Sequence, residues 1–197
     1  MATITPNNTI GTAAISLQEV TASPYVVVGS DLDVAGHRVA VFSAKIGRIE
    51  TDAFTAPVLI IIEGKFADGK YAPIYTLSSG ITAAVTEAVA STAAADQNRI
   101  EVADDAGFTV GLNIYINDAT PANSEFNTVV FAGTDDYLLL RTPLELEHLN
   151  TSDLWTQADI FAPVVINVEA YDAVRVVVDG SAALQTFAVE VLYNTYD

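Results

Sequence analysis

Residues 57–78 have the sequence PVLIIIEGKFADGKYAPIYTLS, and this stretch decides the fold class. Its first part is short, apolar and rich in β-branched side chains, which is typical of a buried strand. Ala67-Asp-Gly69 is a tight-turn signal, so residues 71–78 are predicted to be the antiparallel partner of a β-hairpin. Pro73 cannot donate a hydrogen bond within a sheet, and it predicts that this partner is an edge strand or begins after Pro73.

The same strand composition recurs on both sides of this hairpin. Further strands are predicted at residues 25–28, 37–49, 163–169, 173–179 and 186–193. Residues 82–97 are rich in Ala and Thr, for which helix and strand patterns compete, and we expect an extended crossover there. The sequence therefore predicts an all-β fold, an antiparallel β-sandwich of the jelly-roll-like kind.

In the middle of the chain the predicted strands are shorter and more closely spaced. Short strands are predicted at residues 99–102, 107–111, 113–116, 125–131 and 137–140, separated by Gly or Asp turns. A spacing of about 8–12 residues is typical of a small barrel or sandwich. Thr142-Pro-Leu-Glu145 matches a capping box and predicts a brief helical turn that ends at His148.

These patterns predict a division into three parts. Residues 1–9 are expected to form an N-terminal arm, residues 10–94 and 161–197 a β-sandwich host domain, and residues 95–160 an inserted acidic, small β-barrel-like lobe. The alternative is one continuous sandwich without a subdomain.

The formal net charge is −17, from 8 basic and 25 acidic residues, and it is unevenly placed. Residues 83–160 carry a net −11, whereas residues 1–82 carry −2 and residues 161–197 carry −4. Because affinity for nucleic acid comes mainly from Lys and Arg, no nucleic-acid partner is expected. The acidic middle either keeps the protein soluble or faces solvent while the nearly neutral flanks make contacts.

The residue types and segments that are missing from the sequence further restrict the class of protein. Cysteine is absent, which excludes disulfides and thiolate chemistry. Residues 1–9 contain no Lys, Arg or apolar run, so we do not expect a signal peptide. No stretch approaches the roughly 18 apolar residues of a membrane helix, so no membrane partner is expected. These features predict synthesis in a cytoplasm.

Motifs for catalysis are missing from the sequence. The two histidines, His37 and His148, lie in different predicted parts of the chain, and there is no Gly-x-Ser-x-Gly elbow and no Walker loop. We therefore predict no enzyme activity, no catalytic residue and no cofactor. A two-carboxylate hydrolase stays open as the weakest alternative.

Acidic pairs and aromatic rings leave two further interpretations open. The acidic turns at residues 104–105 and 135–136 either bind a cation or are simply solvated, and no metal is predicted. Trp155, Tyr115 and Tyr137 lie in the predicted lobe, where such rings either fill a core or contact a sugar.

One segment carries a family resemblance. Residues 98–116, followed by residues 123–126, 134–140 and 142–144, resemble a module that recurs in tailed-bacteriophage virion proteins. Ala173-Val-Arg-Val-Val-Val-Asp-Gly-Ser181 is similar to the closing sandwich strands of the same proteins. The resemblance covers about half the chain, and its motifs are structural.

This resemblance implies a capsid decoration or cement protein. The implied partners are the major capsid protein and further copies of this chain, as a homo-oligomer such as a trimer, and the implied location is the capsid surface of the virion. The polar arm would contact the partner through Ala2, Thr3, Ile4, Thr5 and Pro6. The alternative is a tail- or fibre-associated carbohydrate or receptor-binding module, with Trp155, Tyr115 and Tyr137 on the ligand.

Overall fold

The computed structural model describes residues 12–22, 26–49, 57–80, 83–133, 136–180 and 185–197, and the structural findings concern these residues. The predicted arm, residues 1–9, lies outside them. The described residues form β-strands, one short 3-10 helix and no α-helix, which confirms the all-β class.

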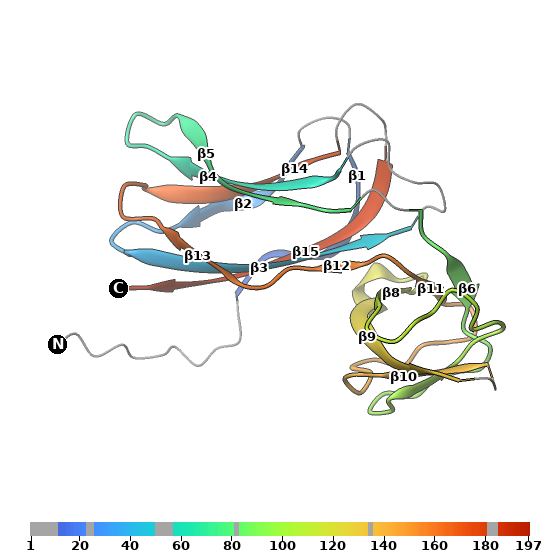
Figure 1. Ribbon diagram of the computed structural model, residues 1–197. Helices are drawn as coiled ribbons and strands as arrows, with labels where there is room; N and C mark the ends of the chain where they lie inside the picture. Colours follow the sequence, from blue (N-terminus) through green and yellow to red (C-terminus); the bar gives the residue numbers. More distant parts are fainter. Residues whose placement is uncertain (1–11, 23–25, 50–56, 81–82, 134–135, 181–184) are drawn as a thin grey trace.

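The elements follow one another along the chain (Figure 1). They are β1 (Thr12–Ala22), β2 (Val26–Asp33), β3 (Val39–Arg48), β4 (Leu59–Lys65), β5 (Tyr71–Ser78), β6 (Thr86–Ala88), β7 (Arg99–Glu101), β8 (Asn113–Asn117), η1 (Pro121–Asn123), β9 (Glu125–Ala132), β10 (Tyr137–Leu140), β11 (Asp153–Trp155), β12 (Asp159–Ile160), β13 (Val164–Asn167), β14 (Ala173–Asp179) and β15 (Gln185–Tyr196).

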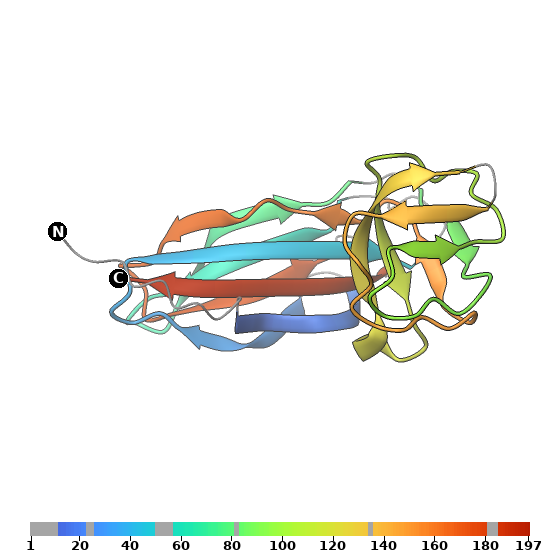
Figure 2. The ribbon, with the colours of Figure 1, turned by 90° about the horizontal axis from the view of Figure 1, so that it is seen from below.

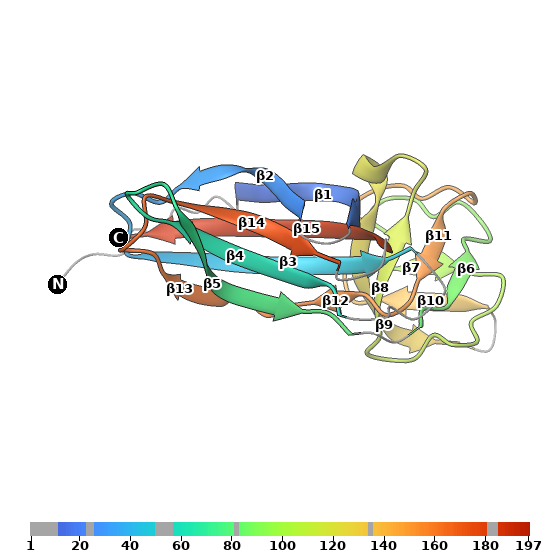
Figure 3. The same ribbon diagram turned by 90° about the horizontal axis from the view of Figure 1, so that it is seen from above.

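Two antiparallel sheets face each other as a sandwich (Figures 1 and 3). One has the order β1-β15-β3-β12, with β13 also paired to β3, and the other has the order β2-β14-β4-β5. Alternate residues of β3, such as Phe42 and Ile46, point into the core and meet Ile60, Ile62 and Val176 of the other sheet. The period of two along these strands therefore places one face of each sheet in a shared core.

The hairpin that decides the fold class is confirmed. β4 and β5 pair from Leu59 with Ser78 to Lys65 with Tyr71. The turn closes with the backbone N–H of Gly69 donating to the Phe66 carbonyl at 2.8 Å, and Gly69 has a φ of +82°. β5 lies at the edge of its sheet, as Pro73 predicts.

A third sheet forms the lobe at one end of the sandwich, while the C terminus lies at the other end (Figure 2). Its six strands have the order β6-β11-β8-β9-β10-β7 and curl into a half-barrel. The sheet closes around its own apolar core, which contains Ile100, Ile114, Val129, Leu138 and Leu154. The fold is thus a jelly-roll-like sandwich with an inserted barrel-like lobe.

The domain boundaries at residues 94 and 160 stay a prediction. β6 pairs with β11 and so belongs to the sheet of the lobe, whereas β12 pairs with β3 of the sandwich. Val85 and Thr156 face each other where the chain enters and leaves the lobe: the Val85 N–H donates to Thr156 Oγ1 at 2.8 Å, and the Thr156 N–H donates to the Val85 carbonyl at 3.0 Å.

The strand predicted at residues 107–111 is wrong. Gly107 and Gly111 have φ values of +96° and +90°, which lie in the left-handed region that a strand does not use. The Phe108 N–H donates to the Asp105 carbonyl at 3.0 Å, and the Leu112 N–H donates to the Thr109 carbonyl at 3.1 Å. The segment is a pair of turns that places Phe108 in the lobe core.

The helical turn predicted from Thr142 to His148 is also wrong. The N–H of Glu145, which a capping box would satisfy locally, donates to Glu125 Oε2 on β9 at 2.8 Å. His148 forms an isolated antiparallel bridge with Ala93, with backbone hydrogen bonds of 2.8 and 2.9 Å. Tertiary pairing thus replaces the local capping interaction.

No helix among the described residues has the length and apolar character needed to cross a bilayer.

Candidate functional site

The lobe is joined to the sandwich by an apolar contact around Tyr115. Its side chain is fully buried, and together with Ala158 and Ala188 it forms a small core that Trp155 and Phe126 cover. A Cβ atom at residue 47 would lie 2.5 Å from Tyr115 Cγ, so only glycine allows the ring to rest on β3. Two rings of the lobe, Tyr115 and Trp155, are therefore part of the junction.

A buried arginine forms hydrogen bonds with both chain segments that cross between the sandwich and the lobe. Arg48, at the end of β3, is 1% exposed, and its Nε donates to the Gln157 carbonyl at 3.3 Å while its Nη2 donates to the Gly80 carbonyl. The Gly80 N–H in turn donates to Asp159 Oδ2 at 3.1 Å. Gly80 precedes the lobe in the sequence and Gln157 follows it, so one side chain fastens the outgoing and the returning segment.

Burial shapes the electrostatics of this contact. Burial lowers the pKa of Arg48, and the charge of Asp159 opposes that shift. Burial likewise raises the pKa of Asp159, against the Gly80 N–H and the charge of Arg48. Both shifts follow from removing charge from water, and each partner reduces the cost of the other.

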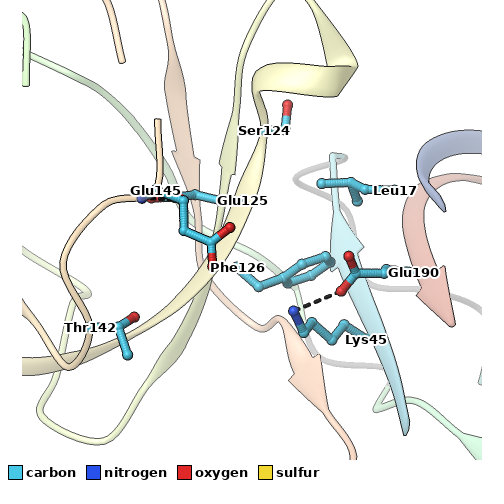
Figure 4. Close-up of a pocket in the computed structure, with 8 residues that line it drawn as sticks. All are labelled: Leu17, Lys45, Ser124, Glu125, Phe126, Thr142, Glu145 and Glu190. Carbon is cyan, nitrogen blue, oxygen red and sulfur yellow. Dashed lines mark hydrogen bonds and ion pairs between the residues drawn. The ribbon is translucent and has the colours of Figure 1, made fainter. Parts of the chain in front are cut away.

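A small polar pocket lies next to the Tyr115 contact, since Phe126, whose ring centroid is 5.0 Å from that of Tyr115, forms part of the pocket wall (Figure 4). It has a volume of about 70 Å³, and residues of the sandwich and the lobe share its wall. Lys45 Nζ of β3 lies 2.7 Å from Glu190 Oε2 of β15 and 5.6 Å from the centre of the Phe126 ring of β9. Lys45 thus links the sandwich to the lobe by an ion pair on one side and a cation-π contact on the other.

A buried carboxylate and histidine lie behind the pocket, inside the lobe. His148 is fully buried, and its Nε2 lies 3.3 Å from Glu125 Oε1. The other carboxylate oxygen of Glu125 accepts the Glu145 N–H at 2.8 Å. Glu125 therefore connects β9 to the irregular segment that contains Glu145 and His148.

The pocket brings acids together, which is what a two-carboxylate hydrolase requires, but the side chains are already engaged. Glu190 pairs with Lys45, and Glu125 faces His148 and the Glu145 N–H. Ligand pockets have volumes of roughly 300–1,000 Å³. A space of about 70 Å³ does not enclose a sugar residue and its scissile bond. The geometry supports a structural contact.

The remaining candidate residues lie apart from this junction. His37 Nδ1 lies 2.8 Å from Asp197 Oδ1 at the end of the sandwich, far along the chain from His148. Asp104, Asp105 and Asp136 come within 4.8 Å of one another on the lobe surface. Exposed acids often gather without an ion, so this cluster alone does not indicate a cation site.

The rings predicted to contact a ligand are divided between two places. Tyr115 and Trp155 are cross-strand partners on β8 and β11 at the junction, and Tyr115 is fully buried. Tyr137 lies on β10 beside Phe131, with ring centroids 5.7 Å apart. The predicted contact residues Ala2, Thr3, Ile4, Thr5 and Pro6 lie outside the described residues. The ligand and partner roles of these residues stay predictions.

Sequence reasoning missed the residues that hold the junction. Gly47 and Arg48 end a strand that is otherwise apolar or neutral at its inward positions, and glycine inside a strand often marks a close approach of another group. That signal was present, but it did not identify Tyr115 as the group.

Comparisons with known proteins show a weak likeness to two solved structures and no match in sequence. No family model and no curated protein sequence matches this chain. Among solved structures, it is similar to VP17, a capsid protein of bacteriophage P23-77, at 6% identity over 92% of this chain and 96% of that chain, with a TM-score of 0.20. The VP16-VP17 complex of the two major capsid proteins of bacteriophage P23-77 gives 6% identity, coverages of 94% and 100%, and a TM-score of 0.22. Likeness at this level carries no argument about function.

Proposed function

We propose that this chain is a non-enzymatic structural protein of a bacteriophage virion, more specifically a capsid decoration or cement protein that binds the major capsid protein. The observation that carries the proposal is the resemblance of residues 98–116 and of the segments that follow them to a module of phage virion proteins. The structural character of those motifs agrees with a role in assembly.

The distribution of charge supports an orientation for the protein on the particle. Residues 83–160, the segment that contains the lobe strands β6 to β11 and also the short β12 of the sandwich, carry a net −11, while the flanking segments carry −2 and −4. The lobe lies at one end of the sandwich and the C terminus at the other (Figure 2). In this proposal the nearly neutral sandwich contacts the capsid lattice, and the acidic lobe points outward, where its charge limits association between particles.

The packed and hydrogen-bonded junction between the lobe and the sandwich supports the proposal that the protein acts as one rigid body on the capsid. Tyr115 packs on Gly47, and Arg48 fastens both crossings of the chain. A protein that bridges capsid subunits must resist deformation, and buried polar contacts with fixed partners provide such resistance. The copies assemble as a symmetric oligomer, which we propose is a trimer, because capsid sites repeat by symmetry.

Deleting residues 2–9 tests the docking role of the arm. Particles that lack the protein would be incubated with the full chain or the deletion variant, and the bound amount would be measured by quantitative mass spectrometry. We expect much lower occupancy for the deletion variant, because an arm that orders on a neighbour contributes contact area. Equal occupancy would contradict the role of Ala2, Thr3, Ile4, Thr5 and Pro6.

The proposed oligomer is tested separately by sedimentation of the purified chain. A trimer is expected at the concentrations used for particle binding. A monomer that nevertheless saturates particles would show that the chain docks one copy at a time.

A further inference from the structure

β9, β10 and β7 are neighbouring strands of the lobe sheet (Figure 3), and their registers place a row of side chains on its outer face. Leu139 of β10 pairs with Arg99 on one side and with Phe131 on the other, and Tyr137 pairs with Glu101. Because cross-strand partners point to the same face, these side chains share one surface. Leu138 and Leu140, the alternate residues of β10, point into the core.

The aromatic part of this face is held in place and exposed. The rings of Phe131 and Tyr137 lie 5.7 Å apart with an interplanar angle of 32°, and the Arg99 guanidinium carbon lies 4.3 Å from the centre of the Tyr137 ring. A Cβ atom at Gly133 would lie 2.8 Å from Phe131 Cε1, so the glycine leaves room for the ring. Phe131 is 43% exposed, and the neighbouring Val130 is 39% exposed.

A polar hollow of about 140 Å³ adjoins this aromatic surface, and Arg99 belongs to both. Glu101 is oriented by two partners: Ser91 Oγ donates to its Oε2 at 2.8 Å, and Arg99 Nη2 lies 3.2 Å from its Oε1. The wall is completed by Thr92, Ala93 and Gln97. Hydroxyl, amide, carboxylate and guanidinium groups are therefore gathered beside the half-buried Tyr137 ring, and the exposed Phe131 ring lies on from Tyr137 along the same face.

We propose that this face binds a neutral glycan. A sugar ring has an apolar C–H face and a polar edge of hydroxyl groups, and the surface offers both complements side by side. The apolar face would rest on Phe131, while the hydroxyl groups would donate to Glu101 and accept from Arg99 and from the Gln97 amide. The orientation of Glu101 by Ser91 and Arg99 prepares an acceptor before the ligand arrives.

The charges select against anionic ligands. Residues 83–160 carry a net −11, and the charge of Arg99 is already paired with Glu101. Sulfated or sialylated polysaccharides and nucleic acid would meet repulsion that this arginine alone does not offset. A neutral oligosaccharide is not penalised, so it fits the surface best.

This inference goes beyond the proposed structural function and does not depend on it. The predicted ligand contacts were Trp155, Tyr115 and Tyr137, and only Tyr137 belongs to this face. A virion protein whose lobe points outward would present such a face to the surroundings. A Phe131→Ala variant should occupy particles as well as the unchanged chain, which separates the failure of one proposal from that of the other.

Residue-resolved NMR of the full chain with maltotriose, cellotriose and triacetylchitotriose at millimolar concentration tests the site. At least one of these sugars is expected to shift the amide signals of Gln97, Arg99, Glu101 and Phe131. Phe131→Ala should weaken binding at least about tenfold. Gln97→Ala, a change at an exposed position that is not expected to disturb folding, should also weaken binding.

Phe66→Ala is the matched control, because Phe66 is 39% exposed and also pairs with a tyrosine, Tyr171, at 5.1 Å on the sandwich. It should leave sugar binding unchanged. The proposal is wrong if none of the three sugars shifts these signals, if Phe131→Ala binds as well as the unchanged chain, or if only a heparin oligosaccharide binds. Signals at Phe131 that shift with protein dilution alone would identify a protein interface and would also contradict it.

Discussion

The ring of Tyr115 occupies the space that a side chain at residue 47 would need, since a Cβ atom there would lie 2.5 Å from Cγ and 2.7 Å from Cβ of the tyrosine. Tyr115 belongs to β8 of the lobe and Gly47 to β3 of the sandwich. The two parts of the molecule are thus fitted together by one large buried ring over one glycine, and this contact fixes where the lobe stands.

Gly47→Ala is expected to weaken this junction. The added methyl group would lie 2.5 Å from Cγ of a fully buried ring, and overpacking of this kind costs about 1–3 kcal/mol. Chemical denaturation followed by circular dichroism measures the loss. Gly80→Ala is the control, because its Cβ would meet its nearest side-chain atom, Arg48 Nη2, at 3.7 Å, an ordinary contact. Equal stability of the two variants would show that the ring does not need the glycine.

Arg48→Met tests whether the arginine stabilises the two chain segments that cross between the sandwich and the lobe. Methionine fills similar space but cannot donate to the Gly80 and Gln157 carbonyls, and a hydrogen bond to a charged group contributes about 1.5–3 kcal/mol. Faster hydrogen exchange at the amide of Gly80 should accompany the loss of stability. Arg38→Met, a change at an exposed position, should lie within about 0.5 kcal/mol of the unchanged chain.

If Arg48→Met left both the free energy of unfolding and the hydrogen exchange at Gly80 unchanged, Arg48 would not stabilise the junction.

Asp159 predicts a definite pH dependence. Burial raises its pKa above the ordinary value of 3.8, so the folded state holds this proton more tightly than the unfolded state does. Its contribution to stability is therefore present at low pH and is lost as the pH rises from 3.8 through the raised pKa of the folded state. Asp159→Asn keeps an acceptor for the Gly80 N–H and removes the titration.

Thermal unfolding of both proteins between acidic and neutral pH checks this sign. The difference in Tm between Asp159→Asn and the unchanged chain should move in favour of the variant as the pH rises. A difference that stays constant, or that moves the other way, would mean that the Arg48 charge outweighs burial at this carboxyl.

Glu125→Ala should destabilise the lobe. The change removes the carboxylate that accepts the Glu145 N–H and lies 3.3 Å from His148 Nε2, and a hydrogen bond to a charged group contributes about 1.5–3 kcal/mol. Glu145→Ala is the control, because that side chain is exposed. Denaturant titration compares the two, and a loss no greater for Glu125→Ala than for Glu145→Ala would contradict a structural role for this carboxylate.

Local patterns in the sequence predicted the elements that their own composition and turns define. The hairpin of β4 and β5 is set by its own composition and by the turn at Gly69, and β14 was predicted with its observed bounds. The predicted helical turn at residues 142–148 failed because the Glu145 N–H is taken by Glu125, a partner that no local pattern contains.

The contacts between distant segments could not be predicted in the same way. Gly47 and Tyr115 meet only after the sandwich and the lobe have formed, and the row of Arg99, Tyr137 and Phe131 depends on the register of three strands. A shift of one residue in that register would turn these side chains to the other face of the sheet. The sequence contains the residues, but only the pairing places them on one surface.

The central claim is that this chain is a structural component of a phage particle. Cryo-electron microscopy of purified particles, combined with mass spectrometry of their protein content, tests it most directly. We expect a fixed number of copies per particle, bound to the major capsid protein on the outer surface with the lobe pointing away from it. Particles that lack the chain altogether, or a catalytic turnover of a substrate by the purified protein, would contradict it.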